Sequence, residues 1–165
     1  MGTDKQMKVK GIIFEDFVNY RYPCMTLQMP FCSFKCDKEC GMSVCQNSAL
    51  ASAPIKEWTV HSIIREYLHN HLTSAICFQG LEPFDSFDDL YDFIKEARIY
   101  YYLPCDIVIY TGYNKDEIQD KIDKLKKFKN IVVKFGRYIP GHEPHFDSVL
   151  GVSLSSPNQY AERIS

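Results

Sequence analysis

Short apolar runs alternate with amphipathic segments along most of the chain. Apolar residues at helical spacing predict three helices, one over about residues 57–72, one that starts at Ser86 and one that starts at Asn114. Their buried faces are expected to consist of Val60, Ile63, Ile64, Tyr67 and Leu68, then Phe87, Leu90, Tyr91 and Ile94, then Ile118, Ile122, Leu125 and Phe128. Short apolar runs predict strands at residues 9–14, 25–29, 75–78, 107–110, 131–135 and 150–154.

Strands that alternate with helices predict an α/β fold with a mostly parallel sheet, because right-handed crossover helices join parallel strands. The length of 165 residues suits one domain, residues 1–165. About six strands are too few to close an eight-stranded barrel, so we expect a partial barrel or an open sheet. Ligands of both architectures bind at the carboxyl ends of the strands.

Composition excludes two classes of partner. Lys and Arg total 19 against 21 Asp and Glu, and this balance does not favour a nucleic-acid binder. No apolar run approaches the roughly 18 residues that a membrane span needs. The N-terminal residues contain no apolar core of a signal peptide, so we expect a cytoplasmic protein.

One long segment, residues 30–54, lacks periodicity and contains four of the seven cysteines. These are Cys32, Cys36, Cys40 and Cys45. A reducing cytoplasm disfavours structural disulfides, so clustered thiols indicate metal ligands. Thiolates bind both iron–sulfur clusters and zinc, and paired cysteines at these spacings also fit a zinc site. The cysteine pattern alone leaves both metals open.

The wider sequence resembles the cluster loop of radical S-adenosylmethionine (SAM) activating enzymes. The run CMTLQMPFCSFKC contains their C-x3-C pair at Cys32 and Cys36. Their third cysteine follows an apolar residue, and in the anaerobic ribonucleotide reductase activases an Asn comes two positions later. Cys45, with Asn47 after it, matches this pattern. Eight residues separate Cys36 from Cys45 where the family usually has two, so Cys40 stays an alternative third ligand.

Three further segments follow in the order of that family. Residues 79–83, QGLEP, resemble the Gly-Gly-Glu-Pro segment, with one inserted Leu and with Gln at the place of the first Gly. Residues 110–113, YTGY, match the activase signature, and residues 155–159, SSPNQ, resemble its terminal Ser-Ser-Asn-Gln segment. The chain is most similar to phage and Gram-positive variants of the family, which carry a GGLEP segment.

The resemblance implies a partial (βα)6-like radical SAM barrel with a [4Fe–4S] cluster on Cys32, Cys36 and Cys45. It also implies that SAM occupies the iron without a cysteine ligand and is cleaved reductively to methionine and a 5′-deoxyadenosyl radical. The implied cofactor-binding residues are Asn47, Gly80, Glu82, Pro83, Thr111, Gly112 and Lys134. Glu82 would accept hydrogen bonds from the SAM amino group, and Lys134 would pair with the SAM carboxylate.

The activase resemblance further implies two protein partners. One is the glycyl-radical subunit of an anaerobic ribonucleotide reductase, and the other is an electron donor such as flavodoxin or ferredoxin. Two other functions stay open at this point: a radical SAM enzyme for another peptide or a small molecule, and a non-catalytic module that holds zinc or an electron-transfer cluster.

Overall fold

The computed structural model describes residues 5–33, 37–38, 41 and 48–165. A six-stranded sheet with the order β10-β7-β6-β5-β3-β2 forms its centre. The strands of this sheet are β2 (Gly11–Asp16), β3 (Cys24–Met29), β5 (Ala75–Gly80), β6 (Asp106–Tyr110), β7 (Ile131–Phe135) and β10 (Tyr160–Arg163). Two smaller pairs lie beside it, β1 (Gln6–Val9) with β4 (Lys56–Thr59), and β8 (His145–Asp147) with β9 (Val152–Leu154).

The central sheet is mixed. Strands β3, β5, β6 and β7 are parallel, whereas both edge strands run antiparallel to their neighbours. The four parallel strands bring their carboxyl ends to the same edge of the sheet. The partial radical SAM barrel stays a prediction.

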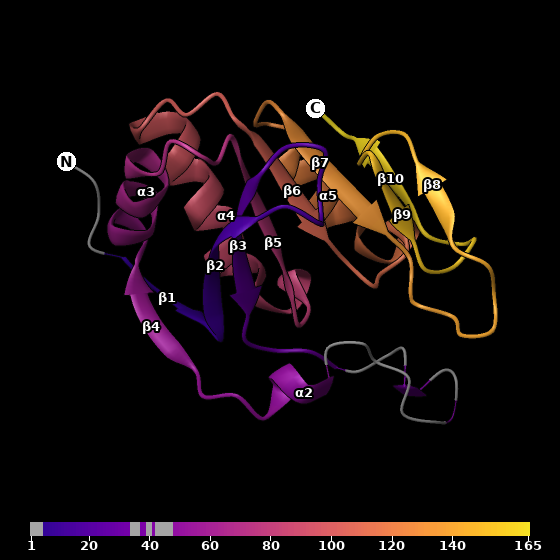
Figure 1. The fold of residues 1–165 in the computed structure, drawn as a ribbon. Coiled ribbons are helices and arrows are strands. Elements are labelled where there is room, and N and C mark those ends of the chain that lie inside the picture. The colour runs from indigo at the N-terminus through magenta and orange to yellow at the C-terminus, as the bar shows by residue number, and fades with distance from the viewer. Residues whose placement is uncertain (1–4, 34–36, 39–40, 42–47) are drawn as a thin grey trace.

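Helices cover one face of this sheet (Figure 1). They are α3 (Val60–His69), α4 (Phe87–Lys95) with a π-helical turn at Glu96–Tyr100, and α5 (Gln119–Leu125), while the short helix α2 (Ser48–Ala51) follows the cysteine segment. All four expected residues of the third helical stripe are buried: Ile118, Ile122, Leu125 and Phe128. Among the helices that the structure describes, none combines the length and the apolarity of a membrane span.

The first helix is shorter than its periodicity predicts. Residues 56–59 pair with β1 instead, and the Thr59 hydroxyl accepts a hydrogen bond from the Ser62 N–H at 3.0 Å, which caps the helix start. Leu68 is 47% exposed, so the expected apolar stripe is wrong at this position. In α4, Phe93 is fully buried, while Phe87 and Tyr91 are only partly buried.

The C-terminal strands also differ from expectation. The run expected as the last strand, residues 150–154, contributes β9, which pairs with β8 outside the main sheet. The sheet is completed by β10, antiparallel to β7. Its sequence, YAER, buries only Ala161, so no apolar pattern marks it.

Candidate functional site

The face of the sheet without helices changes from apolar to polar along the parallel strands. Its apolar part includes Ala75, Cys77, Val108 and Val132. Side chains alternate between faces, so the same face carries Gln79, Tyr110 and Lys134 two residues further on. Tyr110 pairs with Lys134 in register. These three polar side chains therefore lie at the carboxyl edge, where α/β sheets bind ligands.

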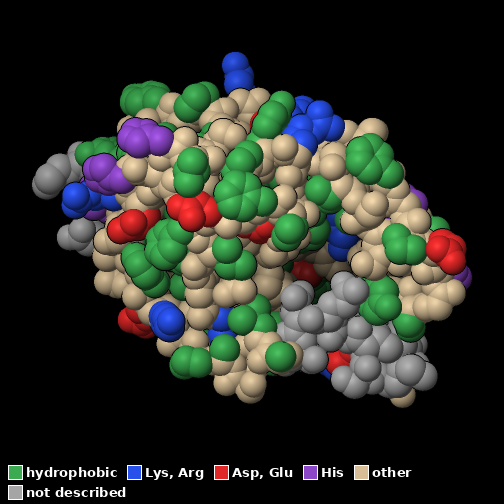
Figure 2. Space-filling view, viewed as in Figure 1, with side chains coloured by type: hydrophobic (Ala, Val, Ile, Leu, Met, Phe, Trp, Pro, Cys, Tyr) green, Lys and Arg blue, Asp and Glu red, His purple; other side chains and the backbone are tan. Residues whose placement is uncertain are grey.

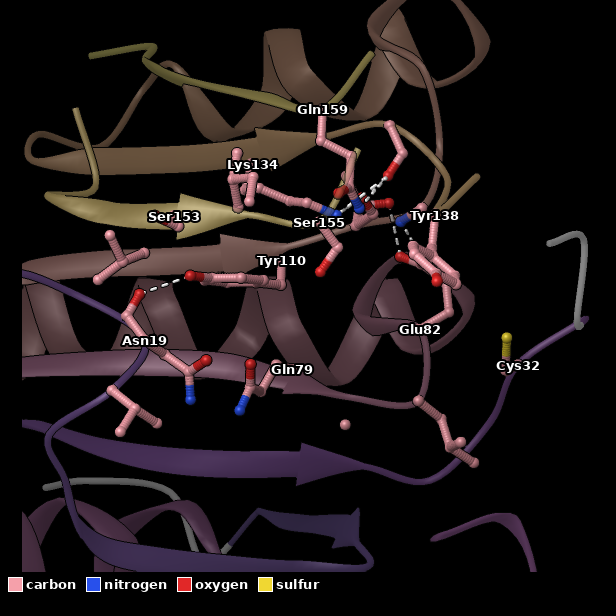
Figure 3. A pocket seen from close by; sticks show the side chains of 18 residues that line it. Asn19, Cys32, Gln79, Glu82, Tyr110, Lys134, Tyr138, Ser153, Ser155 and Gln159 are labelled. Carbon is pink, nitrogen blue, oxygen red and sulfur yellow. Dashed lines mark hydrogen bonds between the residues drawn. The ribbon is translucent and has the colours of Figure 1, made fainter. Parts of the chain in front are cut away.

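A cavity of about 320 Å³ opens above these polar side chains. Figure 2 shows a hollow on this face of the molecule with acidic and basic side chains at its bottom. Its lining includes Asn19, Cys32, Gln79, Gly80, Glu82, Tyr110, Thr111, Gly112, Lys134, Gly136, Tyr138, Ser153, Ser155 and Gln159. Four segments that the sequence analysis singled out therefore meet around one cavity (Figure 3).

Glu82 is the buried acid of the cavity and is only 7% exposed. Its carboxylate accepts hydrogen bonds from the Thr111 hydroxyl at 2.7 Å and from the Gly112 N–H at 2.8 Å. The Phe84 N–H donates a third at 3.0 Å, because Glu82 also caps the short 3-10 turn Pro83–Ser86. Thr111 and Gly112 of the YTGY segment thus bond to the carboxylate of Glu82 in the QGLEP segment.

Burial raises the pKa of Glu82 to about 7, against the lowering effect of these three hydrogen bonds. Between pH 4.5 and about 7, the folded protein therefore keeps a proton on Glu82 that the unfolded chain, with an ordinary pKa of 4.5, has lost. Folding stability from this group is present below pH 4.5 and is lost as the pH rises through about 7.

Replacing Glu82 with Gln should abolish this pH-dependent loss. Relative to the variant, the cluster-free wild type should lose up to about 3 kcal/mol of unfolding free energy between pH 5 and 8. Urea unfolding of both proteins at each pH measures this difference. The contributions of the other titrating groups cancel because both proteins contain them. Parallel pH profiles of the two proteins would contradict the raised pKa of Glu82.

Lys134 is the buried cation of the cavity and is 7% exposed. Its ammonium donates to the carbonyls of Thr111 at 3.3 Å and Gly136 at 3.0 Å, and it lies 5.7 Å from the centre of the Tyr110 ring. Glu82 and Lys134 thus contact the same residue, Thr111, through its hydroxyl and its carbonyl. The cavity therefore holds an acidic and a basic side chain that are both hydrogen-bonded to Thr111.

Two glycines with left-handed backbone line the cavity. Gly80 has φ +89°, and a Cβ there would lie 2.8 Å from the Gln28 Cα. Gly136 has φ +104°, and a Cβ there would lie 3.0 Å from the Asn158 carbonyl oxygen. Side chains are disfavoured at both positions by the left-handed backbone and by the neighbouring backbone atoms.

The SSPNQ segment packs against the loop that follows β7. The Asn158 amide donates to the Arg137 carbonyl at 2.8 Å, and the Ser156 hydroxyl accepts from the Ile139 N–H at 3.2 Å. The Gln159 side chain accepts from the Ser156 N–H at 3.1 Å. This segment therefore builds one wall of the cavity, to which Ser155 and Gln159 contribute.

Cys32 is half-buried and lies at one end of the cavity (Figure 3). The preceding residue, Phe31, accepts a backbone hydrogen bond from Glu82 at 2.8 Å. The first cysteine of the proposed cluster is thereby tied to the acid of the cavity. The other cluster residues, Cys36, Cys40 and Cys45, and the proposed cofactor residue Asn47 lie outside the described residues.

Of the remaining proposed cofactor residues, Gly80, Glu82, Thr111, Gly112 and Lys134 line the cavity. Pro83 does not, and is buried at the first position of the 3-10 turn. Sequence reasoning gave no site role to Asn19, Tyr138 or Ser153, which also line it. These residues stand in no recognised motif.

Comparison with known proteins identifies a family. The family model described as a 4Fe-4S single cluster domain matches residues 23–151. This family stands in the radical SAM-associated group of families. No curated protein matches the chain. The matched region contains the four cysteines of the loop and the polar carboxyl edge of the sheet.

Proposed function

Because the chain belongs to the family of 4Fe-4S single cluster domains, we propose that it is a radical SAM activase of an anaerobic ribonucleotide reductase. A [4Fe–4S] cluster follows from the family, and SAM and the reductase are our proposals. The supporting observation is that Glu82 and Lys134, of opposite charge and both buried, share one cavity with Cys32.

The described residues fit both groups. SAM carries an ammonium and a carboxylate on its amino acid part, and the two buried charges of the cavity are complementary to them. Gly80 and Gly136 line the cavity with backbone alone, which lets a ligand approach the chain closely. The Cys32 thiol lines the same cavity and is the soft ligand type that an iron–sulfur cluster requires.

Each residue then has a definite task. Cys32, Cys36 and Cys45, with Cys40 as the alternative third ligand, would hold the cluster. Glu82 would accept hydrogen bonds from the SAM ammonium, oriented by Thr111 and Gly112, and Lys134 would pair with the carboxylate. Tyr110 closes the floor of the cavity, where its hydroxyl donates to the Asn19 carbonyl at 2.5 Å.

The bound cluster would supply the electron that cleaves SAM, and the resulting radical would abstract hydrogen from a glycine of the reductase. The chain itself has to exclude water from the cavity and leave one side open to a protein substrate. An electron donor such as flavodoxin or ferredoxin would reduce the cluster.

Anaerobic reconstitution tests this function. The chain is loaded with iron and sulfide, reduced, mixed with SAM, and assayed for 5′-deoxyadenosine and methionine by mass spectrometry. Addition of the cognate reductase should then produce a glycyl-radical signal in electron paramagnetic resonance. SAM cleavage without that signal would point to another radical SAM substrate. A protein that holds zinc and never cleaves SAM would be a binding module.

A further inference from the structure

Asp85 connects the start of the cysteine segment to the YTGY turn. Its carboxylate accepts a hydrogen bond from the Ser33 N–H at 2.9 Å and another from the Tyr113 hydroxyl at 2.6 Å. These partners are 52 and 28 residues away along the chain. A carboxylate that only stabilised its own 3-10 turn would bond to nearby backbone. Both contacts of Asp85 instead join distant segments.

These contacts belong to a closed ring of hydrogen bonds. The Tyr113 N–H donates to the Thr111 hydroxyl oxygen at 3.0 Å, and that hydroxyl donates to Glu82 at 2.7 Å. The Glu82 N–H in turn donates to the Phe31 carbonyl at 2.8 Å. Cys32 lies between Phe31 and Ser33, so the backbone on both sides of this cysteine is bonded into the ring.

We propose that Asp85 is a positioning residue that closes this ring and holds Cys32 at a fixed place beside Glu82. The cluster role of Cys32 rests on the proposed function, whereas the ring itself can be tested without a cluster. Asp85 does not line the cavity and touches neither Cys32 nor Glu82 through a hydrogen bond of its carboxylate. It acts through Ser33 and Tyr113.

The first measurement uses the cluster-free protein and the rate at which iodoacetamide alkylates Cys32. A tryptic peptide from Tyr22 to Lys35 contains both Cys32 and the buried Cys24, which serves as internal reference. Asp85→Ala should raise the rate at Cys32 about tenfold relative to Cys24, because the local backbone loses its anchor. Tyr113→Phe, which breaks one bond of the ring, should give a smaller increase.

Asp85→Asn separates geometry from charge. Its amide oxygen still accepts from the Ser33 N–H and its NH2 group can donate to the Tyr113 oxygen, but the negative charge is gone. We expect a rate at Cys32 within about twofold of the wild type. An acceleration equal to that of Asp85→Ala would mean that the charge of Asp85 acts on the thiol, and would overturn the positioning role.

Two control variants test whether any substitution near this region raises the alkylation rate of Cys32. Asp88→Ala removes an exposed carboxylate from the same region. Lys10→Met removes an ammonium that donates to the carbonyls of Ala51 at 3.1 Å and Ala53 at 2.5 Å, at the far end of the cysteine segment. Both should leave the alkylation of Cys32 unchanged. Equal acceleration in the controls, or no acceleration in Asp85→Ala and Tyr113→Phe, would refute the proposal.

The second measurement uses the reconstituted protein and the rate of iron release to a chelator. The same order of variants is expected, with Asp85→Ala about tenfold faster than wild type and Asp85→Asn close to it. A wild type that takes up no cluster would refute the proposed function, while the alkylation rates would still decide whether Asp85 holds Cys32. Should Asp85→Ala fail to fold, Tyr113→Phe and Asp85→Asn still give the comparison.

Discussion

Replacing Cys32 with Ala is expected to abolish cluster binding, so that iron falls from about four atoms per chain to background. Three thiolates hold such a cluster when the fourth iron is left for a ligand, and removal of one leaves two. Cys32 is half-buried and lines the cavity, where its thiol faces the site proposed for the cluster. Iron and sulfide analysis after anaerobic reconstitution measures the loss.

Cys77 and Cys105 supply the matched controls. Cys77 is fully buried within the sheet, where burial raises the pKa of its thiol well above the ordinary value and disfavours the thiolate. Cys105 is half-buried just before β6, at the amino edge of the sheet. Alanine at either position should leave the iron content unchanged. Full iron in Cys32→Ala would remove Cys32 from the ligand set.

The same analysis identifies the third ligand. Alanine at Cys36 or Cys45 should also abolish iron binding, whereas alanine at Cys40 should not. The reverse result for Cys40 and Cys45 would make the C-x3-C-x3-C run the ligand set.

Replacing Glu82 with Ala should weaken SAM binding by roughly ten- to a hundredfold and leave the cluster intact. A sheltered hydrogen bond between a carboxylate and an ammonium contributes about 1.5–3 kcal/mol, which corresponds to that range. Glu82 is prepared for this contact because Thr111 and Gly112 already hold its two oxygens. Equilibrium dialysis of SAM against the reconstituted protein gives the dissociation constant, and visible absorbance reports the cluster.

The pH dependence of SAM affinity gives a second test of Glu82. Because its pKa is raised to about 7, the carboxylate is protonated at lower pH, so SAM affinity should fall as the pH drops from 8 to 6. The dependence should vanish in Glu82→Gln. Glu66→Ala, at an exposed position of α3, is the control and should bind SAM like the wild type. A dissociation constant that Glu82→Ala leaves unchanged would exclude this residue from the SAM site.

Periodicity in the sequence was enough to place the main buried elements. The apolar runs at residues 107–110 and 131–135 form β6 and β7, and the third helical stripe is buried as expected. Such elements are predictable because a strand or helix that buries one face needs apolar residues at its own period, within a few residues of sequence. Periodicity failed at Leu68, which α3 leaves exposed, and at β10, which pairs with the distant strand β7 without an apolar pattern of its own.

The motifs likewise indicated which loops carry the site, and the family match agrees with the cluster that the resemblance implied. Parallel strands bring their carboxyl ends to one edge, so residues at the ends of β5, β6 and β7 lie near one another. The family resemblance had singled out Glu82, Thr111 and Lys134 among them.

The bonds among these residues were decided only by the tertiary structure. Strand register and loop geometry decide which donors bond to Glu82 and how far its pKa rises. They also decide that Asp85 joins Ser33 to Tyr113. The partners are some 30 to 50 residues apart along the chain. Hydrogen bonds act over about 3 Å, and a sequence pattern carries no information on distances between segments at that resolution. The sequence therefore determined the chemistry available to this protein, and the fold decided which groups meet.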